Sequence, residues 1–352
     1  MKSTFSYFRW SFISAIAAVL FGFWYAGPAG AWTIAVLAIL ETSLSFDNAV
    51  VNASVLNGWS SKFWRNLFIY FGIFIAVFVM RLYFPMLIVS LSTGLGIKEA
   101  FYLALDHPAE YATALTSAHH EVAAFGGCFL MMVALQFFLD AEKECHWIPG
   151  VEAMLSKLGK YEVAVEAGIS LSVLMATASL FDGVEKSEFV AAGVYGFIVY
   201  IVAKLAGQVL SDGADDGKKV AQGVGGLMYL EILDASFSFD GVIGAFAISD
   251  NLFVIMAGLG VGAMFVRSMT IYLVEKGTLS EFRYLEHGAF WAIAALAVIM
   301  FIGVKVEIPE WFTGFIGAGL IVAAVICSHI MNKREATEEK LKETKEMEIQ
   351  SG

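Results

Sequence analysis

The stretch ETSLSFDNAVVNASVL, residues 41–56, places the carboxylates of Glu41 and Asp47 inside an otherwise apolar run. The rest of the chain is similarly apolar. Of its 352 residues 59% are hydrophobic and 16% are charged, whereas soluble domains average about 25% charged residues. Runs of about 20 apolar residues, the length that crosses a bilayer, recur along the chain. The sequence therefore predicts an all-α fold, a polytopic bundle of transmembrane helices with acidic side chains at membrane depth.

We expect nine or ten transmembrane helices, because ten apolar segments are recognisable, of which the first is short and the ninth marginal. Lysine and arginine concentrate in the connections expected inside the cell, and the outside loops carry only Lys98, Lys186 and Lys305. By the positive-inside rule, this bias predicts that both termini are cytoplasmic. The expected location is the cell membrane, taken as the bacterial inner membrane. The predicted segments are residues 11–25, 32–55, 66–91, 121–140, 162–181, 189–210, 226–248, 252–275, 288–304 and 311–331.

Residues 1–331 are predicted to form one transmembrane transporter domain, and residues 332–352 a charged cytoplasmic tail. The tail mixes positive and negative residues without regular apolar spacing, which is typical of a solvated helix. The net charge of −11 and the lack of a basic patch in the sequence give no indication of a nucleic-acid partner. The expected partners are membrane lipid and a metal ion as substrate, and the sequence does not indicate an oligomeric state.

Residues 231–249, EILDASFSFDGVIGAFAIS, repeat the acidic pattern in a second apolar segment. Aligned without gaps, LETSLSFDNAVV and LDASFSFDGVIG share a leucine, an acid and then Ser-x-Ser-Phe-Asp. Glu41 then corresponds to Asp234, and Asp47 corresponds to Asp240. A match of this length inside two apolar segments predicts an internal duplication.

The two acidic motifs are expected to cross the membrane in opposite directions, because they lie in the second and the seventh predicted segments. The segments that follow them each carry an arginine, Arg81 and Arg267. The predicted architecture is an inverted-topology repeat with halves near residues 32–140 and 226–331. This plan is typical of secondary transporters, which bind their substrate at the repeat interface near the middle of the membrane.

The acidic side chains predict a binding site for a hard cation. A carboxylate at the bilayer centre costs about 2.5–3.5 kcal/mol, so it must be protonated, paired or bound to a cation. Arg81 and Arg267 can neutralise at most two of the five acids in the motif segments. Carboxylate, amide, hydroxyl and carbonyl oxygens suit Mn²⁺, Mg²⁺ or Ca²⁺ better than zinc or copper. The predicted metal ligands are Glu41, Asp47, Asn48, Glu231, Asp234 and Asp240.

Helix geometry leaves two arrangements open for these ligands. Glu41 and Asp47 lie about 9 Å apart along an unbroken helix and about 120° apart around it, so one ion cannot easily bridge them. Each acid can meet a partner from the opposite repeat, or the helices can open near Asn48 and Gly241 and expose backbone carbonyls. We expect a combination of both. No tightly bound cofactor is expected, and protons are expected to replace the ion when it leaves.

Polar residues outside the motif segments have alternative interpretations. The predicted outer loop, residues 92–120, is either an ion-gathering vestibule or an ordinary hydrated loop. Asp182 and Glu185 form either an outer ion station or a polar loop. Glu286 and His287 either cap a helix at the interface or take part in gating or proton relay. The acidic and histidine residues of the outer loop are Asp106, His107, Glu110, His119 and His120.

The strings ETSLSFDNAVV and DGVIGAFAISDNLFVIMAGLGVGAMFVR resemble the TerC family of integral membrane proteins, and VRSMTIYLVEKGTLSEFRYLEHGA resembles its TerC-like branch. The resemblance covers most of the chain. It implies a metal-ion exporter with Mn²⁺ as the expected ion, and a link to tellurium resistance. Where many relatives read Asp-Ser-x-Pro-Ala, this chain has Asp-Gly-Val-Ile-Gly, and Asp234 is the expected compensating ligand. The family's motif residues fall on Glu41, Asp47, Asn48, Glu231 and Asp240.

Three functions compete on this sequence. The preferred one is a divalent-cation exporter that works by alternating access, in exchange for protons. The alternative is a non-transporting membrane scaffold in a metal or tellurite stress-resistance complex, with the acids around a structural ion. An intramembrane aspartyl protease would be expected to carry a Gly-x-Gly-Asp motif, which the sequence lacks. We therefore expect no enzyme activity.

Overall fold

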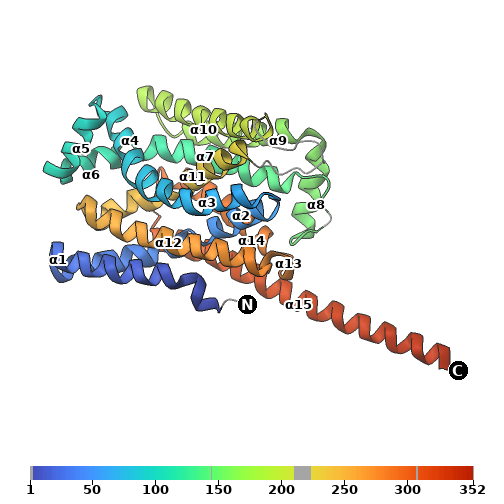
Figure 1. Ribbon diagram of the computed structural model, residues 1–352. Helices are drawn as coiled ribbons and strands as arrows, with labels where there is room; N and C mark the ends of the chain where they lie inside the picture. The colour runs from blue at the N-terminus through green and yellow to red at the C-terminus, as the bar shows by residue number, and fades with distance from the viewer. Residues whose placement is uncertain (1–2, 144, 210–222, 307, 352) are drawn as a thin grey trace.

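Helices make up every regular element among the residues that the computed structural model describes, which are 3–143, 145–209, 223–306 and 308–351 (Figure 1). The predicted all-α fold is therefore confirmed. Along the chain the elements are α1 (Thr4–Leu44), α2 (Phe46–Asn57), α3 (Lys62–Phe74), η1 (Ile75–Tyr83), α4 (Phe84–Thr93), α5 (Ile97–Asp106), α6 (Pro108–Ser117), α7 (His119–Phe138), α8 (Pro149–Leu158), η2 (Gly159–Tyr161), α9 (Glu162–Ala178), α10 (Gly183–Val209), α11 (Val224–Ile248), α12 (Leu252–Lys276), α13 (Thr278–Glu281), α14 (Leu285–Gly303) and α15 (Glu310–Ser351).

Eight helical stretches in the described part of the chain are long and apolar enough to cross a membrane, compared with the nine or ten that we predicted. One difference arises because α1 joins the first two predicted segments into a single 41-residue element. The other is α11, which has 25 residues but carries Glu231, Asp234 and Asp240. Together these helices indicate a multi-pass membrane protein.

The α1 element reverses its direction at Gly27. The backbone of Gly27 has φ 70° and ψ −164°, which is outside the helical region, and Pro28 starts the second leg. The two legs then lie against each other, since a Cβ on Gly22 would be 3.0 Å from the carbonyl oxygen of Gly30. The first two predicted segments are therefore the two legs of one helical hairpin.

Both legs of α1 pack along α12 (Figure 1). On the first leg, the Ser11 hydroxyl lies 2.7 Å from the hydroxyl of Ser268. On the second leg, Glu41 lies so close to Gly262 that a Cβ on this glycine would overlap the glutamate side chain. Small residues permit such close helix contacts in membranes. The contact places Glu41 directly on α12.

Helix α7 forms the centre of the larger hydrophobic core. Most of its residues are buried, and it packs against α9, α10, α11 and α14. A Cβ on Gly127 would be 2.9 Å from the Phe301 ring of α14, so the glycine is needed for this contact. Close packing at small residues associates helices in lipid, where burial of apolar surface supplies no driving force. In Figure 1, α10 lies along the edge of the bundle opposite α1.

The start of α1 and the C-terminal part of α15 lie at the end of the bundle where α12 ends (Figure 1). The Tyr7 hydroxyl donates to Glu275 at the end of α12 (2.9 Å). Arg283 donates to Glu335 of α15 (2.6 Å). Helix α15 continues through the predicted tail and extends away from the other helices (Figure 1). Which side of the membrane this end faces stays a prediction.

The predicted third segment, residues 66–91, contains a π-helix that the sequence pattern did not indicate. The elements α3, η1 and α4 follow one another without a gap, and the π-helix η1 spans nine residues. π-helical hydrogen bonds join residues five apart. Such segments are rare in proteins, and those that occur are often found at functional sites. Arg81 lies near the end of η1 and is 2% exposed.

Candidate functional site

The break in the first motif lies at Ser45 rather than near Asn48. Ser45 has φ −97° and ψ 20° and separates α1 from α2. The break is small, because the Ser45 N–H still donates to the Glu41 carbonyl (3.0 Å) and its own carbonyl accepts from Ala49 (3.1 Å). Helix α11 continues through Gly241. The expected opening near Gly241 is therefore wrong, and the one expected near Asn48 is only a small break three residues earlier, so side chains supply the polar groups of the site.

The first motif lies at the end of α1 and the start of α2, and it crosses α11, which carries the second motif, in the antiparallel direction. Two close contacts between described residues join the two motifs. The Asn48 amide donates a hydrogen bond to the Asp234 carboxylate. Glu41 lies against Gly241, where a Cβ would be 2.8 Å from Glu41 Oε2. The motif alignment pairs Glu41 with Asp234 and Asn48 with Gly241, so the two contacts are reciprocal. Reciprocal contacts are expected where the halves of an inverted repeat meet. The repeat itself stays a prediction.

Each buried group of acids has an arginine beside it. The Arg81 guanidinium forms an ion pair with the Glu41 carboxylate, and both side chains are buried. Arg267 interacts electrostatically with Glu231 and Asp234. Pairing with arginine, the alternative to cation binding that the sequence left open, therefore occurs at Glu41.

A small cavity, which we call the inner cavity, lies between the motif helices, η1 and α12 and has a volume of about 20 Å³. Such a volume holds about one particle the size of a water molecule. Two amide oxygens in its wall, Asn48 Oδ1 and Asn52 Oδ1, are buried and have no hydrogen-bond partner among the described residues. Both atoms are acceptors, so they offer lone pairs to a cation or to a water molecule. The charged residues of the wall are Glu41, Asp234, Arg81 and Arg267.

A larger cavity, which we call the outer cavity, has a volume of about 490 Å³. Glu41 and Asp47 lie in its wall, together with His119, His120 and Lys305. The two histidines are the last residues of the loop predicted to lie outside the cell, and Lys305 belongs to another predicted outside connection. This geometry favours the vestibule interpretation for the end of that loop.

Glu41 and Ser45 lie between the two cavities, because both residues are in the walls of both. The Ser45 hydroxyl donates to Glu41 Oε1 (3.1 Å), and Arg81 pairs with the same oxygen. A direct route between the outer and the inner cavity therefore passes this carboxylate.

The structure brings three of the six predicted ligands to the inner cavity, namely Glu41, Asn48 and Asp234. Asp47 faces the outer cavity instead, and its Oδ1 accepts the Asn48 N–H (2.8 Å). The separation follows from the helix, since residues six apart point in different directions. Glu41 therefore lines both cavities, whereas Asp47 lines the outer cavity and not the inner one.

Glu231 does not line the inner cavity. Neither carboxylate oxygen of Glu231 has a hydrogen-bond partner among the side chains that the structure describes. The side chain of Asp240 is outside the described residues. Within the described part of the chain, no three histidine, cysteine, aspartate or glutamate side chains are arranged to hold a metal ion. An ion in the inner cavity would therefore need amide oxygens in addition to carboxylates.

Asn52 lines the inner cavity although it is not among the ligands predicted from the sequence. It lies in the same quoted stretch, four residues after Asn48, and the two asparagines therefore share one face of α2. A second amide four residues after Asn48, inside an apolar helix, is the sequence feature from which Asn52 could have been predicted.

Glu286 and His287 make contacts that suit a structural role at the start of α14. Ser54 donates to Glu286 (2.8 Å), and His287 Nδ1 lies 2.7 Å from Glu152 Oε2. The indole of Trp291 also donates to Glu152 (2.8 Å). Neither Glu286 nor His287 lines the inner or the outer cavity. These contacts favour the helix-end interpretation over gating.

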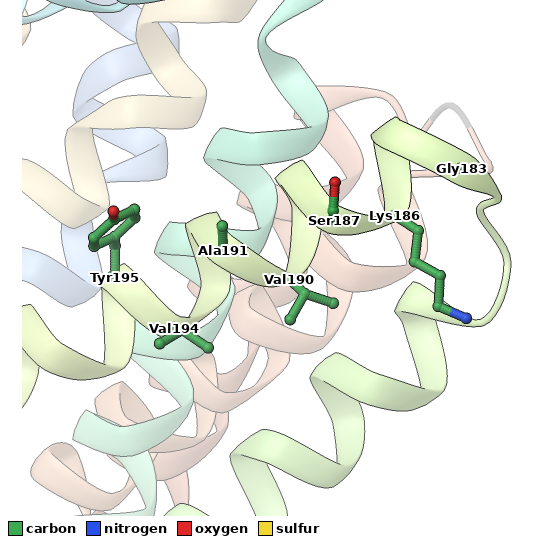
Figure 2. Close-up of a pocket in the computed structure, with 7 residues that line it drawn as sticks. All are labelled: Gly183, Lys186, Ser187, Val190, Ala191, Val194 and Tyr195. Atoms are coloured by element: carbon green, nitrogen blue, oxygen red, sulfur yellow. The ribbon is translucent and has the colours of Figure 1, made fainter.

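Figure 2 shows a further hollow, of about 540 Å³, along one side of α10. All its lining residues come from the part of α10 between Gly183 and Tyr195, and most of them are small or apolar. No predicted ligand lines it, and the exposed acids Asp182 and Glu185 do not line it either. It therefore belongs to the outer surface of the bundle rather than to the acidic site.

One comparison with known proteins gives a match. Residues 46–335 match the family described as "Protein of unknown function (DUF475)". The match begins after Glu41 and includes η1 and the second motif. No curated protein and no solved structure matches the chain, and the resemblance to the TerC family stays a prediction. Because the match covers most of its length, this multi-pass membrane protein belongs to the DUF475 family.

Proposed function

We propose that the chain transports a hard divalent cation across the membrane and binds it in the inner cavity. The observation that carries the proposal is the pair of unpartnered amide oxygens of Asn48 and Asn52 in a one-particle cavity that also holds Glu41 and Asp234. A buried acceptor without a donor costs about 1–3 kcal/mol. A cation, or the water bound to it, offsets that cost at both amides.

The charge balance favours a cation over a neutral ligand. Glu41, Glu231 and Asp234 lie near Arg81 and Arg267, so three acids face two arginines before Asp240 is considered. Two unit charges 4 Å apart interact by about 4 kcal/mol at an effective dielectric constant of 20. A divalent ion doubles that attraction toward each carboxylate, which supports a divalent over a monovalent substrate.

The donor atoms support the choice of ion. The inner cavity presents carboxylate and amide oxygens, and among the residues that the structure describes neither cysteine nor histidine is in its wall. Such donors suit Mn²⁺, Mg²⁺ or Ca²⁺, whereas zinc and copper prefer nitrogen and sulfur. The resemblance to TerC proteins makes Mn²⁺ the expected ion among these three.

The two cavities suggest a direction and a coupling. In an exporter, the outer cavity would be the exit, and a second conformation would open the inner cavity to the cytoplasm. Asp47 in the outer cavity would favour cations over anions on this route. Carboxylates that lose the ion would take up protons, so proton flux opposite to the metal flux is expected.

A second candidate is a non-transporting scaffold with a structural ion in the same cavity. The ion pair between Arg81 and Glu41 favours this candidate, because it neutralises one carboxylate without a transported ion. The two candidates differ in flux and not in binding.

Metal flux into sealed vesicles that contain the purified protein tests the proposal. We expect Mn²⁺ movement, with opposite proton movement, that is lost in Asp234→Asn and kept in the matched surface variant Asp250→Asn. Competition by Mg²⁺, Ca²⁺ and Zn²⁺ ranks the ions. Flux equal to that of protein-free vesicles, combined with Mn²⁺ binding to the protein, would reject transport and support the scaffold.

A further inference from the structure

We propose that Arg81 is an internal counter-ion that holds Glu41 when no metal ion is bound, and that an ion entering the inner cavity displaces it. This inference rests on the proposed function, since it concerns the same site. It adds the residue that keeps the route between the two cavities closed, and the segment that moves to open it.

The ion pair of Arg81 and Glu41 lies at the boundary of the two cavities. Glu41 is in both walls, and Arg81 is in the wall of the inner cavity. Both residues are 2% exposed, so water screens their interaction little. A guanidinium does not lose its proton in proteins. A cation that approaches Glu41 therefore meets a permanent positive charge, and the route is closed to cations while Arg81 stays in place.

The guanidinium of Arg81 donates hydrogen bonds to the Glu41 carboxylate and to the carbonyl of Ala76 within η1. Its Nε is buried and has no hydrogen-bond partner among the residues that the structure describes. An arginine with unused donors is held less firmly than one whose five N–H groups are all bonded. An ion that takes over Glu41 would therefore release Arg81.

The backbone that carries Arg81 provides a way to move it. Arg81 lies in η1, whose hydrogen bonds join residues five apart. Return of the segment from π-helical to α-helical spacing changes the turn of each residue by a small angle, and these changes add along its nine residues. The added rotation would carry the Arg81 side chain away from Glu41.

The second arginine of the site is held in a different way. Arg267 corresponds to Arg81 in the predicted repeat, but it lies in the regular helix α12. Its guanidinium stacks 4.1 Å from the centre of the Phe68 ring and packs against Gly72. Of the two arginines, Arg81 alone lies on a π-helix. This difference indicates that Arg81, whose partner Glu41 lines the outer cavity, is the arginine that moves.

Mn²⁺ titration of the full-length protein in detergent tests this proposal, with wild type, Arg81→Gln and Arg65→Gln compared by calorimetry. Arg65 is the matched control, because it lies on α3 and lines neither cavity. Arg81→Gln removes the competitor for Glu41, so we expect Kd for Mn²⁺ to fall at least about tenfold. If Arg81 only supported the fold, Arg81→Gln would instead weaken Mn²⁺ binding.

Hydrogen exchange of the wild-type protein supplies a second measurement that does not depend on a variant that folds. We expect Mn²⁺ to change the protection of residues 75–83. Unchanged protection there, together with equal or weaker Mn²⁺ affinity in Arg81→Gln, would overturn the role of Arg81 and leave the metal site standing. If neither protein bound Mn²⁺, the proposed function and this inference would fall together. Binding by Arg81→Gln alone would support the block by Arg81 and reject transport by the wild type.

Discussion

Replacement of Asp234 by asparagine removes one charge from the inner cavity and keeps the shape of the side chain. The new amide oxygen can still accept the hydrogen bond from Asn48. At a separation of about 4 Å and an effective dielectric constant of 20, a unit charge and a divalent ion interact by about 8 kcal/mol. Relaxation and the remaining ligands recover part of this energy. We expect a loss of about 3–4 kcal/mol, which corresponds to a 10²- to 10³-fold higher Kd for Mn²⁺.

The stability of the metal-free protein should change in the opposite direction. A buried carboxylate in surplus over its arginines costs about 2.5–3.5 kcal/mol when nothing neutralises it. We therefore expect Asp234→Asn to leave the free energy of unfolding unchanged or about 1 kcal/mol higher without Mn²⁺. Thermal unfolding in detergent, with and without Mn²⁺, measures both effects, and the surface variant Asp250→Asn is the control. A variant that lost stability without metal but kept the full Mn²⁺-dependent shift would refute this reasoning.

Three further predictions concern the surroundings of the site. Asn52→Leu replaces an unpartnered amide by an apolar group, so we expect about 1 kcal/mol more stability without metal and an about tenfold higher Kd for Mn²⁺, measured by unfolding and by calorimetry. Gly241→Ala puts a Cβ 2.8 Å from Glu41 Oε2, and the displaced carboxylate should weaken Mn²⁺ binding, whereas Gly319→Ala, which meets nothing within 4 Å, should not. Burial lowers the pKa of Lys143 from 10.5 to about 7, which destabilises the fold fully below pH 7 and progressively less up to pH 10.5. Lys143→Met should accordingly raise stability by about 2 kcal/mol at pH 6 and have no such effect above pH 10.5; an equal gain at both pH values would show that burial of the charged ammonium is not the cause.

Several parts of the fold and the site followed from local sequence patterns. Long apolar runs are sufficient to predict helices in a membrane, because the backbone can satisfy its hydrogen bonds there only within helices or closed barrels. The alignment of the two motifs predicted that acids of one half would meet partners of the other. Glu41, Asn48 and Asp234 do line one cavity. These features depend on periodicity and charge, which the sequence displays directly.

Other parts depended on packing that the sequence does not display. The π-helix η1 uses the same apolar residues as an α-helix, and no residue type marks it. Whether Glu41 pairs with Arg81 or with an ion depends on how η1 packs against α1 and α12. The break at Ser45 is small because the serine hydroxyl bonds the Glu41 carboxylate and the backbone ladder stays nearly complete. The opening was predicted near Asn48, three residues after the observed break at Ser45.

The position of a bound ion is the most direct test of the central claim. A crystal of the protein soaked in Mn²⁺, measured at a wavelength where manganese scatters anomalously, locates the metal without assumptions about ligands. We predict one peak in the inner cavity, within coordination distance of Asp234 and the side-chain oxygens of Asn48 and Asn52. Peaks only in the outer cavity or on the surface, with the inner cavity holding water alone, would contradict the proposed site.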